Sequence, residues 1–277
     1  RDKLSRVNVT IIEPAKRWRM PDWPQLWAYR ELFLALGARD VRVRYKQTVL
    51  GALWALLQPL ATMIMFTIIF GRFARMPSEG YPYQVFVYSA LLPWTLFSAT
   101  VTSGAASIVG NTALLTKVYF PRLLVPAATV AAPSVDFLVS TAFLLLLTLW
   151  YGVDWTWRLA VVPLLVVITM MLAIGTGTLL SSLTVTFRDT RFLVPFLIQL
   201  WLFATPIIYP SSLVPGRYRW LLWLNPMSGI TDAFRSAFLG RPFNVQSLAV
   251  SAAIAAAMFL FGVAAFQSVE QKVADVL

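Results

Sequence analysis

Histidine and cysteine are both absent from this 277-residue sequence. Without them the chain cannot form a Ser-His or Cys-His catalytic arrangement, nor a zinc site with histidine or cysteine ligands. The phosphate-binding pattern G-x-x-x-x-G-K-[ST] of nucleotide-hydrolysing enzymes is also missing. A D-x-D pair, of the kind that a metal-dependent sugar-nucleotide enzyme uses, occurs nowhere either. We therefore expect a protein that is not an enzyme, with no catalytic residue, no metal site and no cofactor held by this chain.

Charged residues are scarce as well. They make up 13% of the chain, against 58% hydrophobic residues and a mean hydropathy of +0.70, whereas soluble domains contain about 25% charged residues. This composition predicts an integral membrane protein. The net charge of +11 does not indicate nucleic-acid binding, because 11 of the 23 Lys and Arg residues lie in residues 1–46, next to the first apolar run. That asymmetry favours membrane orientation, anionic lipid headgroups or an anionic substrate.

Six apolar segments approach the length of about 20 residues that an α-helix needs to cross a bilayer. They cover residues 49–70, 83–107, 124–150, 159–186, 192–209 and 247–267. We therefore predict an all-α integral membrane protein with six transmembrane helices. An even number of spans places both chain ends on one side. If that side is cytoplasmic, 16 of the 23 cations lie inside and seven outside, as expected because Lys and Arg resist translocation.

The chain before the first span is more polar. Residues 1–25 contain no apolar core before a small-residue cleavage site, so we expect no cleavable signal peptide there. Apolar residues recur at helical spacing in residues 25–38, which predicts an amphipathic interfacial helix; a helix packed on a neighbouring domain is the alternative. The alternating pattern of residues 41–46 suits a strand, but beside a span a turn or helix end is favoured. The predicted organisation is a cytoplasmic arm with the interfacial helix (1–48), a six-helix membrane domain (49–267) and a cytoplasmic tail (268–277).

The connection between the second and third spans contains a predicted helix on the cytoplasmic side. Asn111 is placed to cap it, and Pro121 ends it. The segment carries two cations, Lys117 and Arg122.

The outer connection, residues 210–245, is longer than a hairpin needs. Asn225 is placed as the N-cap of a helix and Pro226 as its first residue, with glycine and proline after its end. Asp232 and Arg235 are spaced to pair one turn apart. At about 14 residues this helix reaches roughly 21 Å, so we predict short re-entrant outer helices between the fifth and sixth spans.

One ionisable residue, Asp136, lies well inside a span. Charge at such a depth is costly and often functional, and a proton-coupled carrier needs intramembrane acids. The sequence places no basic residue at comparable depth in any span. A neutral or hydrogen-bonded packing role is therefore favoured over proton coupling.

Aromatic residues are abundant in or near the spans, and their default role is an interfacial belt or lipid-facing bulk. The alternative is a path lined by aromatic faces, on which the C–H faces of sugar rings stack. The residues concerned are Trp54, Phe66, Phe70, Trp94, Phe97, Trp150, Trp201, Phe203 and Tyr209.

Five stretches of the sequence resemble the ABC-2 type permeases that export polysaccharides and polyol phosphates, in the same order and spacing. They are R-D-V-R-V-R-Y-K-Q-T-V-L-G-A-L-W-A-L-L-Q-P-L (39–60), L-L-P-W (91–94), K-V-Y-F-P-R-L-L-V-P (117–126), F-R-D-T-R-F (187–192) and L-N-P-M-S-G-I-T-D-A-F-R (224–235).

The resemblance implies a half-transporter in the bacterial inner membrane. It would act as a homodimer with two copies of a separate ABC ATPase subunit, which bind ATP and Mg, and it would have no nucleic-acid partner. The implied substrate is a polyprenyl-linked glycan such as O-antigen. A teichoic-acid-type polyol phosphate, a capsule polysaccharide, or a drug or lipid is the alternative cargo, and an ion-coupled carrier is the alternative class.

The resemblance also implies roles for individual residues. The ATPase-coupling segment contains Asn111, Thr112, Leu115, Lys117, Tyr119, Phe120 and Arg122. The basic cluster Arg39, Arg42, Arg44 and Lys46 is expected at the substrate entrance, where it binds pyrophosphate or only fixes topology. The expected aromatic residues of the translocation path are Trp54, Phe66, Phe70, Trp201, Phe203 and Tyr209. The expected outer gate consists of Asn225, Pro226, Asp232 and Arg235.

Overall fold

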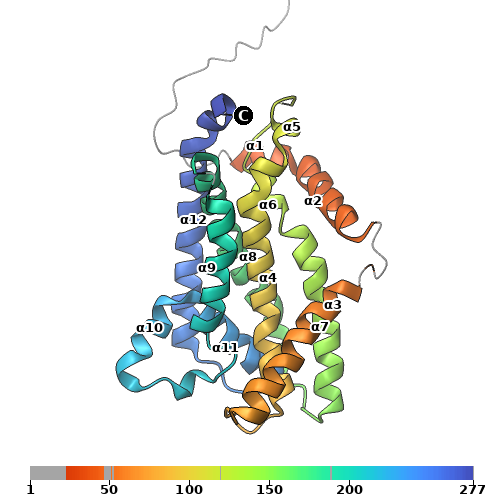
Figure 1. Cartoon of the computed structure of the whole chain (residues 1–277), viewed down its shortest axis with the longest axis vertical. Coiled ribbons are helices and arrows are strands. Elements are labelled where there is room, and N and C mark those ends of the chain that lie inside the picture. The colour runs from red at the N-terminus through yellow and green to blue at the C-terminus, as the bar shows by residue number, and fades with distance from the viewer. Residues whose placement is uncertain (1–22, 47–50, 52, 119, 188, 277) are drawn as a thin grey trace, which may run out of the picture.

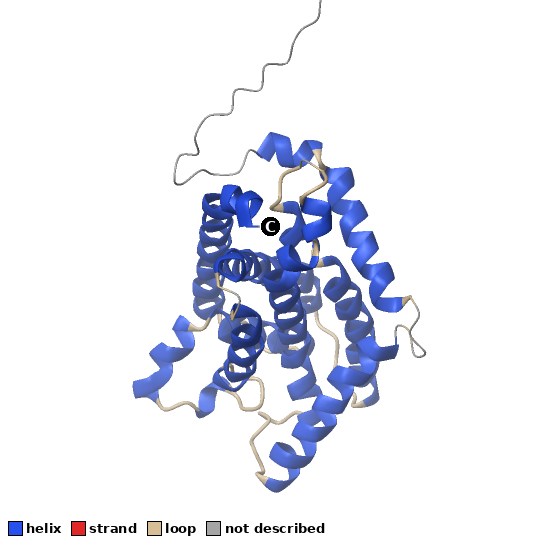
Figure 2. Cartoon of the chain, turned by 45° about the horizontal axis from the view of Figure 1, so that its top comes forward, coloured by secondary structure: helices blue, strands red, loops and turns tan. Residues whose placement is uncertain are grey.

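The computed structural model describes residues 23–46, 51, 53–118, 120–187 and 189–276, with side chains up to residue 269. Every regular element in these ranges is a helix (Figure 2). The predicted all-α fold class is therefore confirmed for the described part of the chain. The predicted arm in residues 1–22 lies outside the described residues.

Within the described part of the chain, five helical segments are long and apolar enough to cross a membrane. The first is α3 (Leu53–Phe66), which continues as the π-helical η1 (Thr67–Phe73), and the second is α4 (Tyr83–Gly110). The third joins α6 (Leu124–Ala128) to α7 (Ala131–Trp150), and the fourth joins η2 (Trp157–Val161) to α8 (Val162–Thr186). The fifth belongs to α12 (Val245–Val276). These five segments correspond to five of the six predicted spans.

The remaining predicted span, residues 192–209, is helical only in part. Its helix α9 (Thr190–Ala204) has 15 residues, or about 22 Å, whereas the hydrocarbon core of a bilayer is about 30 Å thick. The backbone turns to an extended conformation at Thr205, because the ring of Pro206 disfavours a helical residue before it. Five described helical segments are thus long enough to span a membrane, and α9 is a shorter apolar helix.

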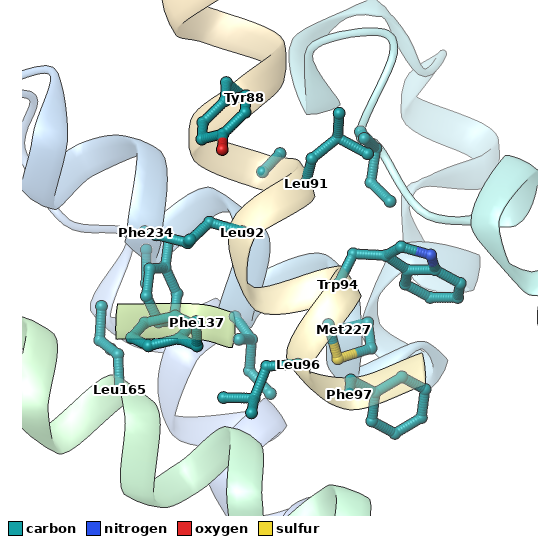
Figure 3. Close-up of a cluster of buried hydrophobic side chains, with 14 of the residues drawn as sticks. Tyr88, Leu91, Leu92, Trp94, Leu96, Phe97, Phe137, Leu165, Met227 and Phe234 are labelled. Atoms are coloured by element: carbon teal, nitrogen blue, oxygen red, sulfur yellow. The ribbon is translucent and has the colours of Figure 1, made fainter. Parts of the chain in front are cut away.

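Helix α4 lies at the centre of the bundle (Figure 1). It packs against α3, α7, α8, α9 and α11, while α12 packs along α8. The core gathers where α4 meets its neighbours, with Phe137 of α7, Leu165 of α8 and Phe234 of α11 around Leu92 and Leu96 (Figure 3). This burial fixes α4 as the element that the other helices surround.

Glycine allows the closest helix contacts. A Cβ atom added to Gly104 of α4 would lie 3.2 Å from the Cα of Gly177 in α8. A Cβ added to Gly262 of α12 would overlap the carbonyl oxygen of Gly175 in α8. Small residues at such crossings let backbones approach within a membrane, so Gly175 and Gly177 let α8 pack closely against α12 and α4.

The short helices divide between two ends of the bundle (Figure 1). One end, which we call the α2 end, holds α1 (Trp23–Ala28), α2 (Arg30–Tyr45), α5 (Thr112–Leu115) and the C-terminal end of α12. The other, the α11 end, holds the turns η3 (Ser211–Leu213) and η4 (Gly216–Tyr218) with α10 (Arg219–Leu224) and α11 (Pro226–Phe238). The segments predicted to be cytoplasmic and those predicted to be outside thus lie at opposite ends.

Helix α2 differs from the predicted interfacial helix in length. The favoured helix end at residues 41–46 is confirmed, whereas the predicted helix 25–38 breaks at Tyr29 and α2 extends beyond it to Tyr45. The reason is packing against α6 and α7. Leu36 is buried, and a Cβ on Gly37 would lie 2.9 Å from the Cβ of Ala131. Such tertiary contacts override an alternating pattern.

Candidate functional site

A cavity of about 490 Å³ lies between α3, α4, α7 and α9, and we call it the α3–α9 cavity. Each of these helices contributes lining residues, and Arg44 of α2 contributes one more. The wall combines hydroxyl side chains, the amide of Gln58 and the indole rings of Trp54 and Trp94. Polar groups and aromatic faces together suit a sugar polymer, which needs both hydrogen bonds and stacking surfaces.

Asp136 is bound from two sides by α2. Its Oδ2 atom lies 2.5 Å from Nη2 of Arg44, and its Oδ1 atom accepts a hydrogen bond from the hydroxyl of Tyr45. Burial, together with the hydrogen bond to Asp136, raises the pKa of Tyr45 to about 12, so the phenol remains a donor at neutral pH. The two contacts satisfy a carboxylate whose side chain is only 17% exposed.

The expectation that Asp136 lacks a basic partner at its depth is therefore corrected. It considered only residues within spans, whereas Arg44 reaches the carboxylate from a helix that precedes the first span. The ion pair and the hydrogen bond offset part of the cost of burying the carboxylate. The contacts agree with the hydrogen-bonded role favoured for Asp136.

Of the four predicted entrance cations, Arg44 is the one that lines the α3–α9 cavity. Arg39 pairs with the neighbouring Asp40 at 2.8 Å. Arg42 is exposed and donates from Nε to the carbonyl oxygen of Ala38 at 3.2 Å. Lys46 follows the C-terminal end of α2. The structure therefore brings one member of the basic cluster to the cavity and leaves the others on the surface of α2.

Of the six aromatic residues predicted for the path, Trp54 lines the cavity. Phe66 and Phe70 pack edge to face with each other, their ring centroids 5.7 Å apart. Phe203 is exposed on α9, at 53%. Of these four aromatic residues, Trp54 is thus the one that the structure brings to the cavity.

The other two path aromatics contact the α11 end. Trp201 donates from Nε1 to Oδ1 of Asn225 at 2.9 Å and packs edge to face on Phe97. Tyr209 is half-buried, and its carbonyl oxygen faces Arg235. Both residues link the end of α9 to the neighbouring helices.

Most of the polar wall was not predicted from the sequence. Thr95, Ser98 and Thr102 recur at helical spacing along α4 and face the cavity. That spacing is the signal that identifies one polar face of a membrane helix. Trp94 appeared among the aromatic residues of the spans but was not assigned to the path.

The predicted coupling segment forms a shorter helix than expected. Only Thr112–Leu115 is helical, as α5. Asn111 does not cap it through its side chain; instead its Nδ2 donates backward to the carbonyl oxygen of Ser107 at 2.8 Å. The cap prediction is wrong because the helix before Asn111 offers a free carbonyl at its own end.

The coupling segment is anchored at two points. Leu115 and Phe120 are buried against Ile108 and Leu36 in a small core at the α2 end. Lys117 is exposed between them. Of the remaining predicted residues, the hydroxyl of Thr112 donates to the carbonyl of Val109 at 2.9 Å, Arg122 is half-buried, and Tyr119 lies outside the described residues.

The predicted start of the outer helix is confirmed. Oδ1 of Asn225 accepts a hydrogen bond from the backbone nitrogen of Met227 at 3.1 Å, and Pro226 is the first residue of α11. Nδ2 of Asn225 donates to Oγ1 of Thr205 at 3.0 Å. The amide thus caps α11 and ties it to the residue at which α9 ends.

Arg235 is wholly buried in α11. Its guanidinium donates to the carbonyl oxygens of Phe86 at 3.2 Å, Ile207 at 2.5 Å and Tyr209 at 3.5 Å. It also lies 3.7 Å from the ring centroid of Phe86, in cation–π geometry. Burial lowers the pKa of Arg235 to about 10, so the group stays charged at neutral pH.

The predicted pairing of Asp232 with Arg235 is corrected by these contacts. Asp232 is half-buried, and no ion pair joins it to Arg235 among the described residues. The guanidinium instead joins α11 to α4 and to the chain that follows α9. The other cation near this end, Arg241, forms an ion pair with Glu79.

Comparison with known proteins agrees with this architecture. The sequence model of the ABC-2 type transporter family matches residues 31–239. An O-antigen export system permease protein of Myxococcus xanthus is 31% identical over 254 residues, which cover 91% of this chain and 97% of the relative. One from Klebsiella pneumoniae is 26% identical, covering 89% and 95%. A polysialic acid transport protein of Escherichia coli is 26% identical, covering 74% and 80%. The chain belongs to the ABC-2 type transporter family.

Proposed function

We propose that this chain is the permease subunit of an ABC transporter that exports a lipid-linked polysaccharide, such as O-antigen, across the bacterial inner membrane. The observation that carries the proposal is the similarity to O-antigen export permeases along almost their whole length. The α3–α9 cavity supports it, because its hydroxyl groups and indole rings suit sugars.

Membership of the family implies an ABC ATPase as partner. We propose two copies of that subunit, which would hold ATP and Mg, and two copies of this chain, with both chain ends cytoplasmic. The exposed Lys117 and the anchored Leu115 and Phe120 make the coupling segment a firm surface on which the ATPase would act. Conformational change would then reach α4 and α6, which flank the segment.

The path would begin at the α2 end and leave at the α11 end. Arg44, lining the cavity, would be the entrance cation nearest to the substrate pyrophosphate, since guanidinium groups suit phosphate. Arg39, Arg42 and Lys46 would only fix the topology of the chain at the membrane surface. The outer gate would comprise Asn225, Pro226, Asp232 and Arg235, which connect α11 to α4 and to the end of α9.

Deleting the gene tests the proposal. We expect a lipid-linked glycan to accumulate in the cytoplasmic leaflet, because synthesis continues while export stops. Accessibility of the glycan to a lectin in inside-out vesicles is the measurement. A teichoic-acid-type polyol phosphate, a capsule polymer, or a drug or lipid accumulating in its place would assign the chain to a different cargo.

Purified complexes separate this class from an ion-coupled carrier. The chain co-expressed with its ATPase should hydrolyse ATP and move glycan only when ATP is present. Proton-driven uptake by the chain alone, with no complex formed, would favour the carrier.

Reversing the charge of Lys117 is expected to weaken coupling. Lys117→Glu changes an exposed cation on the proposed ATPase surface, and a misplaced charge at an interface slows association. We expect several-fold lower ATP hydrolysis in the complex, with normal folding of the permease. The matched control is Arg217→Glu, an exposed cation at the α11 end. Equal loss of hydrolysis in both variants would count against this surface.

A further inference from the structure

We propose that the α3–α9 cavity selects an uncharged, hydroxyl-rich glycan and disfavours polymers that carry a negative charge on each sugar, with Asp136 as a specificity-determining residue. This inference rests on the proposed function and adds the charge class of the substrate. Three features of the cavity wall carry it.

The first feature is the charge balance of the wall. Its lining contains one cation and one anion among the described residues, Arg44 and Asp136, and these form an ion pair at 2.5 Å. The wall therefore has no net charge. Moving a polyanion through a membrane requires compensating cations, because an unpaired charge at that depth is costly. Arg44, whose charge Asp136 balances, would meet the single pyrophosphate of the substrate but supplies no cation for a charge on every sugar.

The second feature is the direction of the hydroxyl groups. Five of the six hydroxyls that line the cavity, all except that of Ser103, each donate a hydrogen bond to a backbone carbonyl: Thr62 to Gln58, Thr95 to Leu92, Ser98 to Thr95, Thr102 to Ser98 and Ser140 to Ala55. A hydroxyl has a single proton and two lone pairs. With the proton used inside the protein, each oxygen presents lone pairs to the cavity.

These hydroxyl oxygens favour neutral sugars over acidic ones. Neutral sugars carry many O–H donors, which match such oxygens. A carboxylate is an acceptor only, so it cannot form hydrogen bonds with the lone pairs of these oxygens. The hydrogen bonds that it made to water are then lost without replacement. The loss of those bonds disfavours the acidic polymer at each step along the wall.

The third feature is the aromatic surface. Trp54 and Trp94 line the same cavity as the hydroxyls. Indole faces interact with the C–H faces of neutral sugar rings and give no attraction to a carboxylate, because the ring face is itself negative. The three features thus favour the same class of substrate.

Asp136 determines this balance through Arg44. Without the carboxylate, Arg44 would be an uncompensated cation in the wall and would attract an anionic polymer. Asparagine at this position keeps a carbonyl oxygen that can accept from Tyr45, whereas a purely structural role of the carboxylate predicts an equal loss of both transport rates. The ratio of transport rates for neutral and acidic substrates separates the two roles.

The test uses the permease–ATPase complex in proteoliposomes with two probes of equal length. One is a polyprenyl-diphosphate-linked mannan, and the other is the same chain with its C6 hydroxymethyl groups oxidised to carboxylates. We expect the wild-type complex to move the acidic chain about ten-fold more slowly than the neutral one, because of the cost of unpaired charge. In Asp136→Asn the ratio should fall at least several-fold. In the double variant Arg44→Gln with Asp136→Asn, which restores neutrality, the ratio should return to the wild-type value.

Asp40→Asn is the matched control, since Asp40 pairs with Arg39 on α2 and is not among the cavity-lining residues. It should leave the ratio unchanged. Equal transport of the two chains by the wild-type complex would overturn the inference and leave the proposed function standing. An unchanged ratio in Asp136→Asn, with both rates reduced alike, would reassign Asp136 to packing and also overturn it. Transport of neither chain would count against the proposed function itself.

Discussion

Replacing Arg235 with leucine is expected to destabilise the protein severely and to abolish export. The substitution removes the donor that three carbonyl groups share: that of Ile207 is buried, that of Tyr209 is partly buried, and that of Phe86 keeps the hydroxyl of Ser89 as a donor. An unsatisfied buried polar group costs about 1–3 kcal/mol. We therefore expect the free energy of unfolding to fall several times more than in an average surface mutant. The measurement is the fraction of detergent-solubilised permease that stays monodisperse after heating, together with the surface glycan of complemented cells.

Two variants define the specificity of this effect. Arg235→Lys keeps a charge but not three separately directed donors, so we expect an intermediate loss. Arg219→Leu removes an exposed arginine of α10 and should behave as wild type. If Arg235→Leu melts at the wild-type temperature, the guanidinium does not hold α11 to the rest of the bundle.

Gly262→Val is expected to prevent correct packing of α12 on α8. Any Cβ at this position overlaps the carbonyl oxygen of Gly175, and a backbone atom cannot move aside as a side chain can. Overpacking typically costs about 1–3 kcal/mol, and a valine adds two further methyl groups at the point of contact. We expect little monodisperse protein on size-exclusion chromatography and loss of ATPase binding.

The matched substitution for comparison is Gly110→Val. Gly110 is likewise a glycine of a membrane helix, the last residue of α4, but a Cβ there meets no atom within 4 Å. That variant should purify in normal amounts. Similar behaviour of the two variants would show that the α8–α12 crossing is looser than its geometry indicates.

Local signals in the sequence predicted much of the fold. Long apolar runs identify spans because lipid leaves backbone groups no partner outside the helix. Asn225 followed by Pro226 identified α11 because an N-cap acceptor and a preset φ act on adjacent residues. These features depend on neighbours in the chain, so the sequence alone contains them.

The long-range contacts of the candidate site escaped prediction for the opposite reason. Asp136 meets Tyr45 at a separation of 91 residues, and Arg235 meets Phe86 at 149. No periodic pattern connects such positions. The length of α2 was underestimated for a related reason, since packing of Leu36 and Gly37 on distant helices decides it. The local pattern therefore predicts the helices of the site, whereas the contacts between its side chains depend on tertiary packing.

Helix α9 has a consequence for the surrounding bilayer. With 15 residues it extends about 22 Å, so it is too short for the acyl chains beside it, and such a mismatch draws lipid headgroups inward. The membrane is expected to be thinnest along this one side of the protein. A hydrophilic polymer that passes there has a shorter distance to travel before it meets water again.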